Sequence, residues 1–361
     1  MKRLIPVLLI LALLLCGCSG AQEAPTTTAV PTTVATVPPT TVATEPPTTE
    51  PPTTEAPVLY RHPLNGQLLE TPYSGRPVTF TIGNTTEALP QSGISKADIL
   101  YEITVEGGLT RLMPLFSDLS QVGAIGSVRS ARTYFVSISR AYHSVFVHSG
   151  NSSYAGNLFA QGVVDHVNAE PTIFYRDQAR VSSGYAWEHC HFTTGSNALA
   201  FLEQNFDMTA DPDANYGLDF VDEQTLEGDS ALKVQVNFGT GWAKTTNFTY
   251  DETAGNYTAY QANRDWMDYD ANEVLRFENL LILYAEKCYA PGTSAGNVLH
   301  TLVGENDGYY ISGGKVVPIK WTREAEDAPF HYELTDGTAL TVIPGKTYIG
   351  IVPPQSPINC E

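Results

Sequence analysis

Two carboxylates and three arginines lie close together in one part of this sequence and could bind or process an anion. Glu102, Glu106 and Arg111 flank a Gly-Gly pair, and Arg129 and Arg132 follow in the motif GSVRSAR. Guanidinium groups are forked donors that match phosphate and carboxylate groups, and paired carboxylates could act as general acid and base. In the structural alternative, the arginines pair with Glu102, Glu106 or other carboxylates.

A second set of candidates lies in the histidine-rich stretch that follows. His189 and His191 would share one face of a strand, where they could bind zinc or copper together with His148. The alternative is a pair of half-exposed histidines around a buried Cys190. The metalloprotease, Walker and dinucleotide motifs are absent from the sequence.

A predicted hairpin positions the two carboxylates. Residues 98–106 alternate, with Ile99, Tyr101 and Ile103 on one face, which indicates a strand. Gly107-Gly108 is typical of a two-residue hairpin turn. That turn would pair Thr104 with Arg111 and place Glu102 and Glu106 within reach of Arg111 on one face.

A predicted helix over residues 128–142 positions the other two arginines. Apolar residues recur there at steps of three and four, and Ser127 suits the N-cap. Arg129 and Arg132 would then lie in the first turn, where the helix dipole disfavours cations by a few tenths of a kcal/mol, roughly. Free N–H groups and two guanidinium groups at a helix N-terminus predict an anion site.

The start of the chain predicts secretion and lipid anchoring. Lys2 and Arg3 precede an apolar run over residues 4–15, which is a signal peptide too short to span a membrane. Leu15-Cys16-Gly17-Cys18 resembles a bacterial lipobox, so we expect cleavage after residue 17 and a diacylglycerol thioether on Cys18. The protein would then be held by this lipid on the outer face of the cytoplasmic membrane. Ordinary secretion is the alternative.

The rest of the chain predicts an α+β protein with a layered α/β N-terminal domain followed by a mostly β C-terminal domain. Residues 18–57 are a lipid-anchored Thr/Pro-rich linker that cannot form a core. Strands and helices alternate over residues 58–206 and give the N-terminal domain. An acidic linker over residues 207–229 leads to closely spaced strands over residues 230–361.

Charge and cysteine content limit the partners. The chain carries 20 basic and 39 acidic residues, a net charge of −19, which repels nucleic acid. Residues 107–142, in contrast, hold four arginines and the single acidic residue Asp118. No cofactor is predicted. Cys190, Cys288 and Cys360 remain after Cys18, enough for one disulfide with one thiol left over, and a Cys288–Cys360 bond would tie the C-terminus to the C-terminal domain.

Several motifs together resemble a known family. SKADILYEITVEGGLTR, GSVRSARTYF, VHSG and FYRDQAR occur in that order, and GGKVVPIKW and GTALTVIPGKTYIGIVP follow. They resemble the YerB-like lipoproteins, bacterial proteins whose domains are of unknown function (DUF3048), over residues 60–353. The resemblance implies a layered α/β fold, a membrane-anchored surface location and no established activity.

The resemblance also extends the set of candidate site residues. The positions that match the family's motifs are Glu102, Glu106, Arg111, Arg129, Arg132, His148, Arg176, Asp177, Arg180 and His189. The family tends to have Pro-His-Asn where this chain has Glu188-His189-Cys190, and His191 has no counterpart there. This chain also has extra residues between Arg180 and His189. These departures weaken the metal and thiol hypotheses.

The sequence therefore predicts a membrane-anchored extracytoplasmic lipoprotein that binds an anionic ligand of the cell envelope. One alternative is an envelope hydrolase or transferase acting on a phosphoester or glycan, with Glu106 or His148 as base. The other alternative is a structural or protein-interaction module.

Overall fold

The computed structural model describes residues 58–211, 214–240, 244–291 and 296–361, all within one compact unit. The predicted signal peptide, Cys18 and the Thr/Pro-rich linker lie outside the described residues. Within the described ranges, no helix has both the length and the apolar character needed to cross a bilayer.

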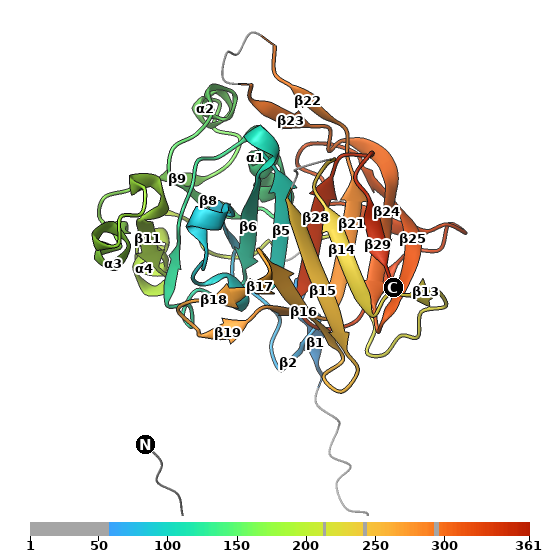
Figure 1. Ribbon diagram of the computed structural model, residues 1–361. Helices are drawn as coiled ribbons and strands as arrows, with labels where there is room; N and C mark the ends of the chain where they lie inside the picture. Colours follow the sequence, from blue (N-terminus) through green and yellow to red (C-terminus); the bar gives the residue numbers. More distant parts are fainter. Residues whose placement is uncertain (1–57, 212–213, 241–243, 292–295) are drawn as a thin grey trace, which may run out of the picture. The chain divides into compact units, whose positions relative to one another are not determined.

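A twelve-stranded mixed sheet forms the centre of this unit (Figure 1). Its strands, in spatial order, are β13 (Asp229–Ser230), β25 (Lys315–Arg323), β24 (Gly304–Ser312), β21 (Asn279–Tyr284), β28 (Thr347–Val352), β5 (Ile99–Thr104), β6 (Thr110–Phe116), β3 (Val78–Phe80), β8 (Val145–His148) and β9 (His166–Asn168). β26 (His331–Leu334) also pairs with β25, and β4 (Ile82–Gly83) with β6. β28 lies parallel to both β21 and β5, so the segments predicted as two domains share one sheet.

A six-stranded sheet packs against the central one. It contains β17 (Arg264–Asp265), β16 (Asn256–Gln261), β15 (Thr245–Asp251), β14 (Lys233–Asn237), β29 (Ile358–Cys360) and β20 (Arg276–Phe277). The smaller sheets are β1 (Tyr60–Arg61) with β2 (Leu68–Leu69), β10 (Tyr175–Arg176) with β11 (His191–Thr194) and β7 (Ala124–Gly126), β12 (Asp219–Phe220) with β27 (Thr341–Val342), β18 (Met267–Asp268) with β19 (Glu273–Val274), and β22 (Lys287–Tyr289) with β23 (Val298–His300).

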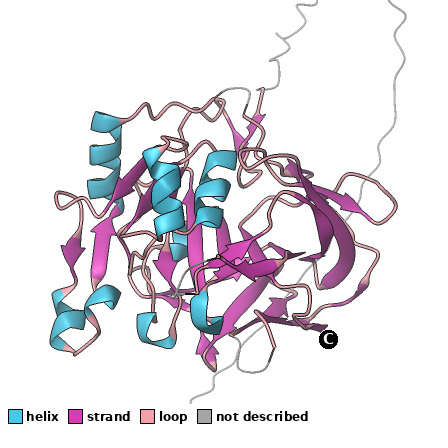
Figure 2. Ribbon diagram, turned by 90° about the horizontal axis from the view of Figure 1, so that it is seen from above, coloured by secondary structure: helices cyan, strands magenta, loops and turns pink. Residues whose placement is uncertain are grey.

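The described α-helices, drawn in cyan in Figure 2, all come from the first half of the folded chain according to their residue ranges. They are α1 (Thr133–Ala141), α2 (Ser153–Ala160), α3 (Gln178–Ser182) and α4 (Gly195–Asn205). The short 3-10 turns are η1 (Thr86–Ala88), η2 (Ile94–Lys96), η3 (Glu106–Gly108) and η4 (Trp187–His189). The α+β fold class with a mostly β C-terminal region is confirmed.

The alternation of β5 separates two hydrophobic cores. Ile99, Tyr101 and Ile103 point into the core that includes residues of α1, as their shared face predicts. Leu100 points the other way, into the core that the six-stranded sheet shares. Both faces of β5 are therefore buried, and the side chain of Glu102 is buried with them.

The hairpin between β5 and β6 differs by one residue from the prediction. Ile103, not Thr104, pairs with Arg111, and the three-residue turn η3 joins the strands. Gly107 and Gly108 have φ values of 71° and 73°, which glycine adopts at no steric cost. Because side chains alternate, this shift places Arg111 on the α1 side of the sheet and Glu102 on the opposite side.

The helix also begins later than predicted, at Thr133, with Arg132 as its N-cap residue. The segment before it is extended, and Val128 forms a bridge to Ile82. Arg129 N donates to Thr81 O at 2.7 Å, so neighbouring strands satisfy the peptide groups that a helix would have used. The predicted placement of Arg129 and Arg132 in a first helical turn is wrong. The predicted disulfide is also wrong, since Cys190, Cys288 and Cys360 are free.

Candidate anion-binding site

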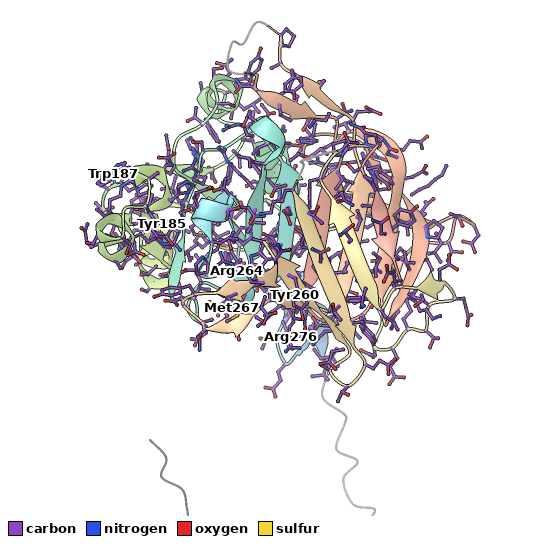
Figure 3. The ribbon with its side chains drawn as sticks, in the orientation of Figure 1. Tyr185, Trp187, Tyr260, Arg264, Met267 and Arg276 are labelled. Carbon is purple, nitrogen blue, oxygen red and sulfur yellow. The ribbon has the colours of Figure 1, made fainter. Side chains whose placement is uncertain are left out.

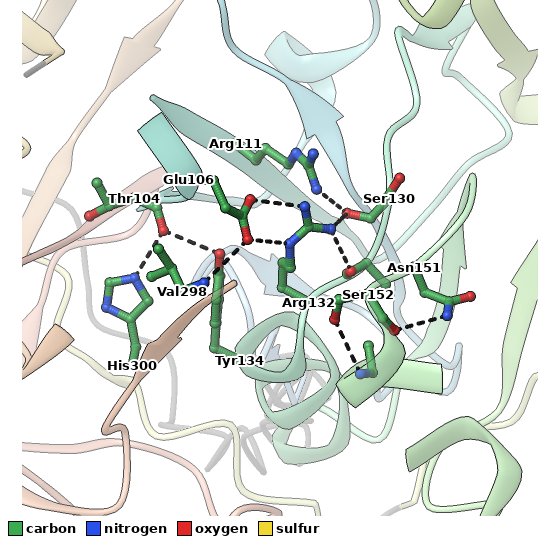
Figure 4. Close-up of polar contacts among 12 residues, drawn as sticks. Thr104, Glu106, Arg111, Ser130, Arg132, Tyr134, Asn151, Ser152, Val298 and His300 are labelled. Atoms are coloured by element: carbon green, nitrogen blue, oxygen red, sulfur yellow. Dashed lines mark hydrogen bonds and ion pairs between the residues drawn. The ribbon is translucent and has the colours of Figure 1, made fainter. Parts of the chain in front are cut away.

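Arg132 forms a two-pronged ion pair with Glu106 (Figure 4). Its Nε donates to Oε1 at 2.8 Å and its Nη2 donates to Oε2 at 2.9 Å. Val298 N also donates to Glu106 Oε1 at 3.3 Å. Burial alone would raise the pKa of Glu106, but the hydrogen bonds and charge of Arg132 outweigh burial and lower it. Arg132 therefore follows the structural alternative, paired with a carboxylate.

Arg111 lies beside this pair, and no carboxylate of a described residue forms an ion pair with it. Its Nη1 donates to the carbonyl oxygen of Ser130, as Figure 4 shows. Burial, together with the smaller effect of the neighbouring cations Arg132 and Arg129, lowers the pKa of Arg111 to about 10, while the charge of Glu106 opposes this shift. The positive charges of Arg132 and Arg129 thus act on Arg111. The carboxylate of Glu106 is close enough to offset them in part, but it already forms an ion pair with Arg132.

Arg129 lies over the position of Gly83, the residue that pairs with Arg111 across β4 and β6. A Cβ atom on Gly83 would be 3.2 Å from Arg129 Cγ and 3.2 Å from Ser127 Oγ, so the absence of a side chain makes this approach feasible. The Arg129 side chain has no hydrogen bond or ion pair within the described ranges, and its Nη1 is buried. Burial lowers its pKa, and the charge of Glu188, an exposed residue, partly opposes this.

Two buried polar atoms accompany Arg129. Ser127 is 0% exposed and His189 is 7% exposed, yet neither Ser127 Oγ nor His189 Nδ1 has a hydrogen-bond partner in the described part of the chain. Burial lowers the pKa of His189, and the charge of Arg129 lowers it further. Buried polar groups are nearly always hydrogen-bonded, so a buried guanidinium with two further unpartnered polar groups forms a set suited to an anion.

Glu102 is not part of this arrangement, although it was predicted to be. It lies between the two sheets and accepts hydrogen bonds from Asn84 (2.8 Å), Thr110 (2.7 Å), Thr246 (2.8 Å), Gln261 (3.2 Å) and Tyr348 (2.8 Å). Nearby, burial lowers the pKa of Lys244 to about 8, while the charge of Glu102 opposes that shift. The carboxylate of Glu102 therefore connects strands and does not face a ligand.

His148 is also occupied by other contacts. Its Nδ1 lies 2.8 Å from Gly150 O and its Nε2 lies 3.1 Å from His166 Nδ1. His191 Nδ1 lies 2.6 Å from Ser149 Oγ. The alternative metal site is not assembled, since no three His, Cys, Asp or Glu residues group as metal ligands in the ranges that the structure describes.

Arg176, Asp177 and Arg180 hold the turn that carries His189. Asp177 caps α3 through Ala179 N at 2.9 Å and forms an ion pair with Arg180 at 3.6 Å. Arg180 donates to the carbonyl oxygens of Ala88 and Pro90, and Arg176 Nη1 donates to Trp187 O at 2.9 Å. These predicted residues position the site and do not themselves surround Arg129.

Sequence reasoning missed two features of this region. Ser127 was expected to cap a helix, and it is instead a buried hydroxyl beside Arg129. The contact between Ser149 and His191 joins residues 42 positions apart, and no motif marks it. For Ser127 the neighbouring arginines were the available signal, because a hydroxyl flanked by cations in a Gly-rich segment suits an anion.

Comparisons with known proteins agree over most of the chain. Residues 64–208 match the model of the N-terminal domain described as "Protein of unknown function (DUF3048)", and residues 234–349 match that of its C-terminal domain. The chain is 28% identical over 286 residues to the "Putative lipoprotein YerB" of Bacillus subtilis (strain 168), which covers 77% of this chain and 81% of that protein. The crystal structure of YerB protein from Bacillus subtilis superposes with a TM-score of 0.71 at 28% identity, covering 83% of this chain and 99% of that one.

Proposed function

Because this chain belongs to the DUF3048 family of proteins of unknown function, we propose a role from its own site: it is a lipid-anchored envelope protein that binds an anionic ligand at Arg129. The likeness to a putative lipoprotein supports the anchor at Cys18 and a place outside the cytoplasmic membrane. The observation that carries the ligand is the Arg129 side chain, which has no carboxylate partner in the described ranges and lies beside unpartnered Ser127 Oγ and His189 Nδ1.

Local charge supports this proposal. The charge of Arg132 lowers the pKa of both Arg111 and Arg129, the charge of Arg129 also lowers that of Arg111, and a bound anion would relieve this repulsion. The net charge of −19 would repel an anion at long range, but such effects fade beyond about 8 Å at physiological ionic strength. Affinity would therefore come from the donors around Arg129 and not from the field of the whole protein.

Binding has more support than catalysis. A general base needs a free lone pair near the reacting group. Both carboxylate oxygens of Glu106 accept from Arg132, and both ring nitrogens of His148 have partners. The purely structural alternative accounts for Arg132 but gives no role to the unpaired cation of Arg129.

Replacing each arginine by glutamine tests the proposal. The Arg129→Gln protein should unfold in denaturant within about 0.5 kcal/mol of the parent, or be slightly more stable, because it loses no ion pair. It should lose the stabilisation that inorganic phosphate or citrate gives the parent, which is about 2.7 kcal/mol at a ligand concentration 100 times Kd. Arg132→Gln should cost roughly 1–3 kcal/mol without ligand, since Glu106 loses its partner in a partly buried setting.

Arg140→Gln is the matched control. Arg140 pairs at 2.8 Å with Asp327, which is 57% exposed, so its loss should have little effect on stability or on the response to phosphate. All measurements use the full-length lipoprotein in a nonionic detergent. A ligand-free loss above about 3 kcal/mol for Arg129→Gln would assign Arg129 a structural role. An unchanged response to both anions in that variant would equally contradict the proposal.

A further inference from the structure

Exposed aromatic side chains gather on one part of the surface. Six tyrosine and tryptophan side chains are exposed in the described part of the chain, and four of them come from two segments, three from residues 175–187 between β10 and η4 and one from the loop after β18. These four are Tyr175 (41% exposed), Tyr185 (37%), Trp187 (60%) and Tyr269 (69%), here called the aromatic surface. Single exposed apolar residues are ordinary on a protein surface, but a contiguous group marks an interaction site.

Contacts with the chain around Arg180 bring these residues together from distant parts of the sequence. Arg180 donates to Pro90 O, and Tyr269 N donates to the carbonyl oxygen of the next residue, Gln91, at 2.7 Å. The phenol groups of Tyr185 and Tyr269 both act on the charge of Arg180. In Figure 3, Trp187 and Tyr185 are labelled at the left of the molecule, and Arg264 and Met267 are labelled nearer its centre.

Two arginines hold the rings in place before any ligand arrives. The Arg176 guanidinium lies 4.5 Å from the centre of the Trp187 ring, and its Nη1 also binds Trp187 O. The Arg180 guanidinium lies 5.2 Å from the centre of the Tyr185 ring and 4.9 Å from the centre of the Phe192 ring. A ring that is already fixed loses little conformational entropy on binding, so stacking there would contribute fully to affinity.

A cleft of about 180 Å³ adjoins the aromatic surface and shares Tyr269 with it. Its lining combines the apolar side chains of Pro90 and Met267 with the polar groups of Arg264, Asp265 and Asn272. Planar carboxylate, amide and guanidinium groups match pairs of neighbouring hydroxyls, while aromatic rings match the apolar C–H faces of sugar rings. We propose that the aromatic surface and this cleft bind a glycan strand of the cell envelope.

The charges around the rings favour a glycan over the other macromolecules. The cores of protein–protein interfaces are depleted of Asp and Glu, yet Glu188, Asp265 and Asp270 are exposed on or next to these segments. The same carboxylates would be repelled by an anionic lipid surface. A neutral polymer of sugar rings is not repelled by these carboxylates, and its hydroxyl groups can donate hydrogen bonds to them.

This inference rests on the proposed envelope location but not on the anion site. Trp187 and His189 belong to the same turn, η4, so one envelope polymer could contact both places. The two sites still depend on different side chains, so variants at Arg129 and at the aromatic residues separate them.

Sedimentation with purified peptidoglycan sacculi, stripped of attached anionic polymers by acid, tests the inference. The full-length lipoprotein in nonionic detergent should co-sediment with the sacculi. Trp187→Ala and Tyr269→Ala should each lower the bound fraction at least fivefold, with a midpoint of thermal unfolding within about 3 °C of the parent because both side chains are exposed. Tyr289→Ala is the matched control, since Tyr289 is 64% exposed and lies on β22.

The possible outcomes separate the two proposals. If Arg129→Gln sediments like the parent and Trp187→Ala does not sediment, the glycan surface is supported, whatever the outcome for the anion site. No sedimentation of the parent, or equal sedimentation of the parent and both aromatic variants, would overturn the inference. An equal loss in Tyr289→Ala would also overturn it, because the binding would then be unspecific.

Discussion

Burial keeps the rings of His148, His191 and His300 neutral at physiological pH, since it lowers the pKa of each to about 4. In an unfolded chain histidine titrates near 6.5, so below that pH the unfolded state takes up protons that the native state does not. Stability from these residues is therefore present above about pH 6.5 and is lost as the pH falls toward 4. Each contributes at most about 1.4 kcal/mol per pH unit across this window.

Urea unfolding at several pH values checks this prediction. The free energy of unfolding should fall steadily between about pH 6.5 and 4.5, a window above that in which carboxylates such as Glu106 take up protons. His300→Gln should flatten the slope in this window, whatever it does to stability at pH 7. A free energy that stays constant from pH 6.5 to 4.5 would show that these rings are not held neutral.

At the residue scale, the predictions from the sequence were only partly correct. It predicted that the cations of the GSVRSAR motif and Glu106 belong together, because opposite charges in one short segment have few other partners. It could not separate Arg129 from Arg132, since that difference depends on the direction of each side chain. Glu102 looked equivalent to Glu106, but four of its five donors come from strands or turns that the sequence pattern could not place beside it.

At the scale of elements, the carboxylate of Glu102 fastens β5 to the strands around it. Thr110 of β6, Thr246 of β15 and Tyr348 of β28 all donate to it. Glu102→Ala would leave the buried hydroxyl groups of Thr110, Thr246 and Tyr348 without their acceptor, so we expect the free energy of unfolding to fall by roughly 3–5 kcal/mol. Tyr348→Phe removes one of these hydrogen bonds and should cost about 1 kcal/mol. Denaturant melts compare the two, and a loss below about 1 kcal/mol for Glu102→Ala would contradict the role of this network.

The errors at this scale have a common cause. The alternation of residues 98–106 and the glycine turn were enough to predict the hairpin, but not whether Glu106 belongs to a strand or to the turn. The apolar spacing of residues 128–142 fits a helix, yet hydrogen bonds to the carbonyl oxygens of Thr81 and Gly150 hold the first part extended. Local pattern decides which residues are buried, while tertiary pairing decides where an element begins.

At the scale of the whole molecule, the strand-rich C-terminal half was predictable from its many short alternating runs. The shared sheet was not, because β5 and β28 pair across almost the whole folded chain and neither pattern specifies its neighbour. The anchor remains a prediction from the sequence, since Cys18 lies outside the described residues. Cys18→Ala removes the sulfur that would carry the lipid, so this variant should leave the membrane fraction. Fractionation that finds the variant still in the membrane, as the parent is, would contradict lipid anchoring.

Calorimetric titration of inorganic phosphate tests the central claim most directly, because it measures binding at Arg129 without reference to stability. The full-length lipoprotein should bind phosphate with one site per chain. Arg129→Gln should weaken that affinity at least tenfold, a loss of about 1.4 kcal/mol, and Arg140→Gln should leave it unchanged. Absence of binding to the parent, or equal affinity in the parent and Arg129→Gln, would contradict the anion site.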